Sequence, residues 1–138
     1  MTYWNPLVPE LTVTCVENSL KFYLAAGFEV RFKRASPDFA YIESGGAQLM
    51  LEQDNPKNWK TAELSRPYGR GVNFQIEVPS AHAVLDSLNK AGIPLFQEIE
   101  ESWYEISAVA EEGQSEFLVK DPDGYLLRFV EPLGSRPK

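Results

Sequence analysis

The stretch EFLVKDPDGYLLRFVE, residues 116–131, predicts two strands joined by a tight turn. Its centre, DPDG at 121–124, places proline and glycine where a turn requires them, and strand-like residues flank it on both sides. Successive side chains of a strand point to opposite faces, so Arg128 is predicted on the face opposite Leu127 and Phe129. This stretch therefore predicts a sheet with one apolar face and one polar face.

Outward from this stretch, the same order of elements occurs twice. A strand-like run at 7–13 precedes a helical pattern at 17–26, and a run at 72–78 precedes a helical pattern at 80–91. Further strand-like runs lie at 28–33, 39–43 and 48–52 after the first helix, and at 93–99, 104–110, 115–120 and 125–131 after the second. The chain therefore predicts a duplicated unit, with modules at 7–53 and 71–131 and a polar linker at 54–70.

Length and composition limit the class of protein. The chain has 138 residues and is 43% hydrophobic, which suits a single domain, 1–138, with its own core. Lys and Arg number 13 against 20 Asp and Glu, so the net charge is -7. We therefore expect no nucleic-acid partner, because phosphate binding needs clustered cations. No run approaches 18 apolar residues, so we expect no membrane partner and a cytoplasmic location. The single cysteine, Cys15, excludes an intrachain disulfide.

Three stretches resemble a known family: ELTVTCVENSLKFYLAAGFEV at 10–30, AQLMLE at 47–52 and EFLVKDPDGYLLRFVE at 116–131. They resemble the vicinal-oxygen-chelate superfamily of glyoxalase I, extradiol dioxygenases, fosfomycin-resistance enzymes and bleomycin-resistance proteins, and are most similar to the bleomycin-resistance type. The resemblance implies an α+β fold in which two βαβββ modules form half-barrels around a cleft. It also implies a homodimer, with chains that pack side by side or exchange an N-terminal segment.

The metal enzymes of this superfamily place four ligands, usually His, Glu or Gln, on four cleft-facing strands. Carried over through the matching motifs, these positions fall on Val8, Met50, Asn73 and Arg128. Val8 has no lone pair, Met50 is a soft donor, Asn73 alone is a weak one, and Arg128 carries a fixed positive charge. The single histidine, His82, is predicted on the surface of the second helix. We therefore expect no metal, no cofactor and no catalytic residue.

Strand alternation also predicts which side chains line the cleft. If the apolar side chains face the helices, the other face carries carboxylates, amides and one guanidinium. The ligand-binding residues predicted on it are Glu10, Gln48, Met50, Glu52, Asn73, Gln75, Glu77 and Arg128. Such a polar face indicates a ligand-filled or water-filled cleft, because buried unpaired charges are costly. A solvated face of an antiparallel sheet gives the same pattern, so the residues alone leave both interpretations open.

Two aromatic residues, Trp103 and Tyr104, complete the predicted ligand-binding set. The resemblance implies that they stack on a flat heteroaromatic ligand. Large aromatic side chains also bury at loop or subunit contacts, so both roles stay open. The bleomycin-binding proteins often carry Trp-Gly where this chain has Glu112 and Gly113, which leaves the ligand unidentified.

Three functions are compatible with these features. The first is a metal-free protein of the bleomycin-resistance type, which sequesters a cationic, partly aromatic ligand of the bleomycin class in an acidic cleft. The alternative is an enzyme of the same fold, a lyase, transferase or dioxygenase-like protein that acts on a small anionic or carbonyl substrate. In that enzyme Arg128 binds the anion and Glu10 or Glu77 moves the proton. The third is an interaction module whose cleft holds a partner protein.

Overall fold

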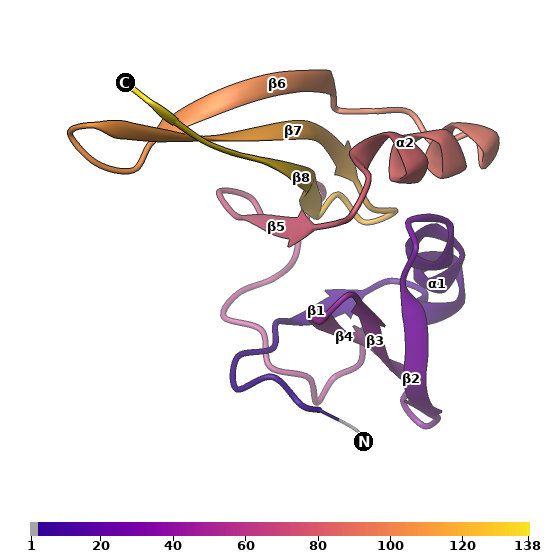
Figure 1. Ribbon diagram of the computed structural model, residues 1–138. Coiled ribbons are helices and arrows are strands. Elements are labelled where there is room, and N and C mark those ends of the chain that lie inside the picture. Colours follow the sequence, from indigo (N-terminus) through magenta and orange to yellow (C-terminus); the bar gives the residue numbers. More distant parts are fainter. Residues whose placement is uncertain (1–2) are drawn as a thin grey trace.

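The computed structural model describes residues 3–138, which form two four-stranded sheets and two helices (Figure 1). The elements are β1 (Glu10–Val13), α1 (Val16–Ala25), β2 (Glu29–Arg34), β3 (Phe39–Ser44), β4 (Ala47–Gln53), β5 (Asn73–Glu77), α2 (Ala81–Lys90), β6 (Gln97–Glu105), β7 (Ala110–Lys120) and β8 (Leu126–Pro137). The order strand, helix and three strands occurs twice. This confirms the predicted α+β class and the two βαβββ units. The single domain and the predicted boundaries of its modules and linker stay predictions.

The two sheets have the same topology. Sheet 1 has the order β1-β4-β3-β2 and sheet 2 the order β5-β8-β7-β6. In each sheet the first strand runs parallel to the last, and the other neighbours are antiparallel. The first strand of each unit is an edge strand, which suits Pro9 just before β1, because proline cannot donate to a ladder. Neither sheet closes on itself, so each forms a half-barrel.

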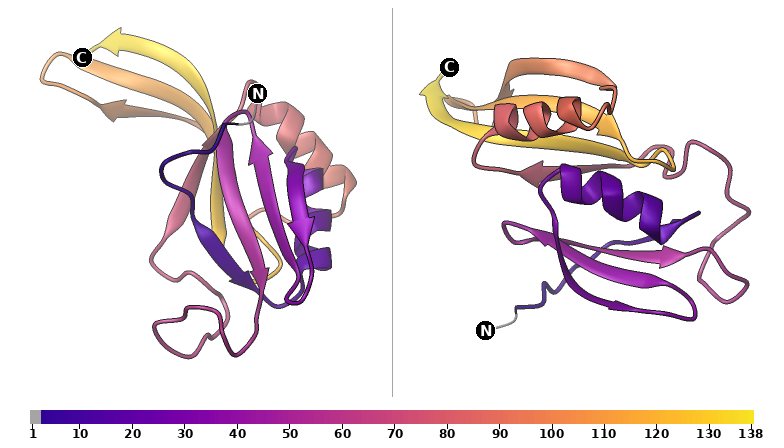
Figure 2. Two further views of the ribbon diagram at one scale, coloured as in Figure 1. Left: turned by 90° about the horizontal axis from the view of Figure 1, so that it is seen from below. Right: turned by 90° about the vertical axis from the view of Figure 1, so that its right-hand side faces the viewer.

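The apolar faces of both sheets share one core with the helices. Leu11 and Leu51 from sheet 1 and Phe117 and Phe129 from sheet 2 belong to the same buried cluster. Both helices lie along one side of the molecule (Figure 2), and α1 contacts α2 where the two units meet. The polar face of each sheet points away from this core. We call it the open face of that sheet.

The DPDG turn joins the two units. The Tyr23 hydroxyl on α1 donates to Asp121 Oδ2 at 2.8 Å, and the Thr14 hydroxyl donates to Asp123 Oδ1 at 2.6 Å. Arg66 Nη2 pairs with Asp123 Oδ1 at 2.9 Å. Gly124 has a φ of +100°, and a Cβ there would lie 2.7 Å from the Cα atom of Pro67, so only glycine fits. The motif that predicts the fold is therefore also the main polar contact between the units.

The strands of the second unit differ from the prediction. The sequence predicts strands at 93–99, 104–110 and 115–120, whereas the structure has β6 at Gln97–Glu105 and β7 at Ala110–Lys120. The pairing of β7 with β8 shifts register between Gly113 and Gln114, and the Trp103 indole lies against Gly113, where an added Cβ would be 2.6 Å from the ring. The turn lies between β6 and β7, and Ile106 N donates to Ala110 O at 3.2 Å.

The long strands of sheet 2 extend past the core. We call this part, residues 101–115 and 131–137, the arm; it projects from the rest of the molecule (Figures 1 and 2). In the first unit, β1 is shorter than the strand predicted at 7–13, because it begins only at Glu10. None of the helices in the described part of the chain has the length and apolar character needed to cross a membrane.

Candidate functional site

The register of the sheets places the predicted cleft residues on two separate open faces. Glu10 pairs with Met50 and Thr12 with Glu52, so these side chains share the open face of sheet 1. Gln75 pairs with Arg128, and Asn73 and Glu77 lie two residues away on the same face of sheet 2. The open face of sheet 1 thus carries Glu10, Gln48, Met50 and Glu52, and that of sheet 2 carries Asn73, Gln75, Glu77 and Arg128. Their role in ligand binding stays a prediction.

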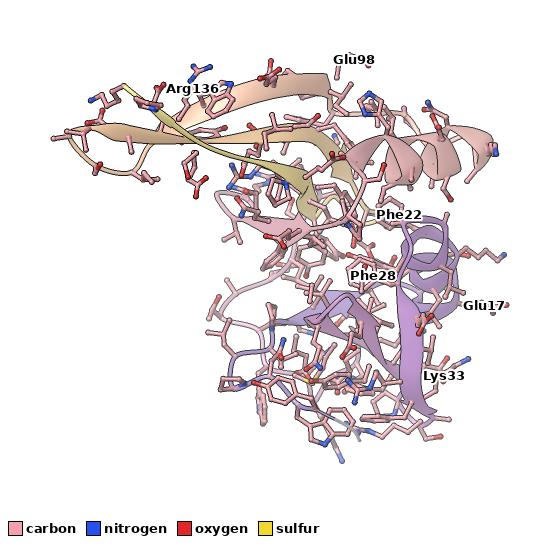
Figure 3. The ribbon with its side chains drawn as sticks, in the orientation of Figure 1. Glu17, Phe22, Phe28, Lys33, Glu98 and Arg136 are labelled. Atoms are coloured by element: carbon pink, nitrogen blue, oxygen red, sulfur yellow. The ribbon has the colours of Figure 1, made fainter. Side chains whose placement is uncertain are left out.

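Trp103 and Tyr104 do not form one stacking surface. They are consecutive residues of β6, so their side chains leave opposite faces of sheet 2. The Tyr104 hydroxyl donates to Glu116 on the open face. Trp103 lies on the other face of the arm, with the Arg136 guanidinium 3.8 Å from its ring centroid, and Figure 3 shows Arg136 on that outer side.

Gln48 is occupied by contacts within the chain. Its side chain is 4% exposed. Its Nε2 donates to Tyr3 O at 2.7 Å and to Glu43 Oε1 at 2.6 Å. Its Oε1 accepts from Asn5 N at 2.8 Å and from the Tyr41 hydroxyl at 2.6 Å. The bonds with Tyr3 and Asn5 hold the N-terminal segment over the open face of sheet 1, and the four bonds together leave the amide no group for a ligand.

An aromatic cluster lies on this open face. Phe32 stacks on Phe39 and Tyr41 with centroid separations of 5.7 and 5.4 Å. Trp4 meets the edge of the same group, 4.9 Å from Tyr41 and 5.9 Å from Phe32. Trp4 is 50% exposed and Phe32 37% exposed, so part of the cluster faces solvent. Sequence reasoning missed it, although the alternation of β2 and β3 places three of these rings on one face.

Cationic groups already lie on these rings. The Arg31 guanidinium is 4.5 Å from the Trp4 ring centroid, and that of Arg34 is 3.9 Å from the Phe39 centroid. Arg31 also pairs with Glu43. Aromatic faces attract cations through their quadrupole. The cluster therefore offers a surface that suits both aromatic and cationic groups.

Glu10 and Glu52 form an acidic pair beside the cluster. Glu52 is paired in register with Phe39, and Glu10 lies on the neighbouring strand of the same face. Partial burial raises the pKa of Glu10, and the negative charge of Glu52 raises it further, against a smaller opposing effect of Arg34. Within residues 3–138 neither carboxylate forms a salt bridge. The pair therefore presents negative charge that no neighbouring cation balances by direct contact.

The open face of sheet 2 is hollowed. The hollow has a volume of about 390 Å³ and is lined by Asn73, Gln97, Glu100, Tyr104, Glu116, Leu118, Leu126 and Arg128. Glu116 lies at its base, 4% exposed, and accepts from the Tyr104 hydroxyl and from Gln114 Nε2 at 2.7 Å. Burial raises the pKa of Glu116, but these hydrogen bonds outweigh it, so the pKa lies below its ordinary value. Glu116 is therefore ionised at neutral pH.

Arg128 lines this hollow beside Glu116. Its Nη1 lies 3.5 Å from Glu116 Oε2, a long ion pair. Its Nε is buried and has no hydrogen-bond partner among residues 3–138.

The positions that match the superfamily's metal ligands do not fit a metal ion. Val8 and Met50 belong to the first unit, and Asn73 and Arg128 to the second. Two of the four have no donor for a cation, since a valine has no lone pair and the Arg128 guanidinium repels one. Across residues 3–138, no group of three or more His, Cys, Asp or Glu side chains is placed to hold a metal ion. We therefore derive no chemistry through a metal at this site.

Comparison with solved structures gives the fold family. TioX from Micromonospora sp. ML1 is 16% identical, over 94% of this chain and 100% of that one, with a TM-score of 0.68. A glyoxalase/bleomycin resistance protein/dioxygenase from Alicyclobacillus acidocaldarius is 17% identical, over 94% and 92%, with a TM-score of 0.62. The bleomycin resistance determinant encoded on the transposon Tn5 is 17% identical, over 93% and 98%, with a TM-score of 0.61. This chain has the glyoxalase/bleomycin-resistance fold.

The glyoxalase/bleomycin-resistance fold is the one that the motifs at 10–30, 47–52 and 116–131 predict, so the resemblance is confirmed at the level of the fold. No family model matches the chain, and no curated protein matches it. At these identities the likeness extends to architecture. One fold hosts many unrelated functions, so this likeness does not assign a function to the chain.

Proposed function

We propose that this chain binds a cationic, partly aromatic small molecule without a metal ion and acts by sequestering it. The observation that carries the proposal is the open face of sheet 1, where the Glu10–Glu52 pair lies beside the aromatic cluster. The carboxylates would pair with a ligand cation, and the exposed rings would stack on its flat part. Two arginine guanidinium groups already occupy ring faces in the cluster, which supports its affinity for cations.

The proposed cleft forms between two copies of the chain. Within one chain the hollow is lined by sheet 2 alone, and the open face of sheet 1 points away from the shared core. A homodimer would place the acidic and aromatic face of one protomer over the hollow of its partner. This arrangement would also cover the exposed parts of Trp4 and Phe32, which are apolar surface that a lone chain leaves in water.

Calorimetry with metal-free bleomycin in the presence of chelator tests the proposal, because the Tn5 determinant of the same fold is a bleomycin resistance protein. We expect one ligand per cleft with micromolar or tighter affinity. A ligand at 100 times its dissociation constant should stabilise the fold by about 2.7 kcal/mol, which raises the melting temperature by a few degrees. No heat at high protein concentration would exclude the bleomycin class. Stabilisation by Ni²⁺, Zn²⁺ or Mn²⁺ would contradict metal-free binding.

Arg128 favours a second candidate, an enzyme acting on a small anionic or carbonyl substrate. Its partly exposed guanidinium, in a hollow that Asn73 also lines, suits an incoming carboxylate or enolate oxygen. Turnover of small carboxylates or carbonyl compounds that survives chelator and is lost in Arg128→Ala would support it. Unchanged turnover in that variant would remove Arg128 from the mechanism.

A further inference from the structure

A second hollow lies outside both open faces. It has a volume of about 710 Å³ and is placed between α1 and the segment that leads from α2 to β6. We call it the outer groove. It shares no lining residue with the hollow of sheet 2. Figure 3 shows one of its lining residues, Phe22, on the side of α1 that faces the second unit.

The outer groove has an apolar floor and wall. Phe22 is 4% exposed and forms part of the core, and Ile93 and Leu95 are half-buried against that core. Phe96 is 58% exposed, a large apolar surface for a side chain that lines a hollow. The segment is held in place by backbone bonds from Ile93 N to Leu88 O at 3.1 Å and from Phe96 N to Leu118 O at 2.8 Å. The groove is therefore formed before any ligand enters.

Two lysines give this groove a positive rim. Lys21 on α1 and Lys120 at the end of β7 line it, and both are exposed. Lys120 Nζ lies 5.6 Å from the centroid of the Phe96 ring. Among the residues that the structure describes, neither lysine forms a salt bridge. Two unpaired cations beside one apolar groove contrast with a chain whose net charge is -7.

The carboxylate that lines the groove does not neutralise the lysines. Asp121 is 4% exposed, and its oxygens accept from the Tyr23 hydroxyl and from the backbone N–H groups of Asp123 and Tyr125. The side chain is therefore turned toward the core. The rim of the groove keeps a positive character.

We infer that the outer groove binds a small amphipathic anion, with an apolar tail on the Phe22, Leu95 and Phe96 surface and an acidic head paired with Lys21 and Lys120. The volume lies in the range of small-molecule sites, which are mostly apolar with a few polar groups that fix orientation. Pairs between ammonium and carboxylate groups are among the stronger hydrogen bonds. This site has the opposite charge preference to the open face of sheet 1.

Calorimetry with three ten-carbon probes tests the inference: decanoate and decyltrimethylammonium below their critical micelle concentrations, and decanol below its solubility limit. We expect one decanoate per chain, and at least tenfold weaker binding of the cationic probe. The double variant Lys21→Gln/Lys120→Gln should weaken decanoate binding at least tenfold. The matched variant Lys33→Gln/Lys57→Gln loses the same charge from exposed lysines elsewhere and should stay within twofold. Phe96→Ser should weaken decanoate and decanol alike.

Several outcomes would overturn the inference. These are no decanoate binding, equal binding of the cationic probe, or equal loss in the two lysine double variants. Light scattering on Phe96→Ser tests whether a second copy of the chain fills the groove. A change in oligomeric state would show that the groove is an interface between copies and would overturn the inference. Decanoate binding unchanged by Glu10→Gln/Glu52→Gln would separate this site from the proposed cleft, and a matching loss there would contradict a second site.

Discussion

Replacing Glu10→Gln and Glu52→Gln together is expected to weaken binding of metal-free bleomycin about 100-fold. Each carboxylate lost removes a charge-assisted interaction with the ligand cation, worth about 1.5 kcal/mol or more. Two of them make about 3 kcal/mol, or roughly two factors of ten in the dissociation constant. Calorimetry on the double variant, at the ionic strength used for the unmodified chain, measures the change.

The loss should not come from unfolding. Glu10 and Glu52 form no salt bridge within residues 3–138, and the pKa of Glu10 is raised by burial and by Glu52. Neutralising two like charges on adjacent strands removes a repulsion, so the thermal midpoint should stay or rise slightly. The control is Glu17→Gln/Glu98→Gln, which removes the same charge from outward-pointing side chains (Figure 3). If both double variants lost the same affinity for bleomycin, the net charge of the chain would explain the loss. That result would contradict a binding site at the acidic pair.

The second large effect concerns Asp121→Asn and the dependence of stability on pH. Burial raises the pKa of Asp121 from 3.8 to about 6, although hydrogen bonds from Tyr23, Tyr125 and Asp123 act against it. Between these two values the folded chain holds a proton that the unfolded chain releases. The stability that Asp121 contributes is therefore full below about pH 4 and is lost as the pH rises through about 6.

The Asp121→Asn variant cannot ionise at this position. The variant's free energy of unfolding minus that of the unmodified chain should therefore rise by about 2–3 kcal/mol from pH 4 to pH 7. This follows from about 1.36 kcal/mol for each unit by which the pKa is raised. Urea unfolding of both proteins at several pH values measures this difference, in which other titrating groups cancel. Asp86→Asn on the exposed side of α2 is the control and should run parallel to the unmodified chain. A parallel curve for Asp121→Asn would show that the turn carboxylate does not titrate in this range.

The fold could be predicted from local patterns because its determinants are local. The DPDG turn and the period-two alternation in β4, β5 and β8 fix which side chains face the core, and the structure has the same faces. The start of β7 was predicted five residues too late, at 115 instead of Ala110, and Gly113 lies inside this strand, against the Trp103 indole of the paired strand. A glycine in a strand marks either a break or a close approach, and the sequence does not distinguish them.

The candidate site could be predicted only in part. Glu10, Glu52, Asn73 and Arg128 were placed on the polar faces by alternation, and the register agrees. The aromatic cluster was missed because Trp4 lies outside any strand and reaches the open face through the bonds that Gln48 makes to the N-terminal segment. The outer groove was missed because the segment after α2, which was predicted as a strand at 93–99, is irregular up to Phe96 and forms one wall of the groove opposite α1. These features depend on contacts between residues far apart in the chain.

The arm gives the molecule two levels of rigidity. Residues Leu126–Val130 of β8 pair with both β5 and β7, whereas from Pro132 to Pro137 the strand pairs with β7 alone. Hydrogen bonds in the outer part can open without exposing the core, so this part should open at a lower free energy than the whole fold. Yet β7 and β8 are continuous, and they carry Glu116 and Arg128 into the hollow. The same two strands therefore connect the tip of the arm with the charges at the base of the hollow.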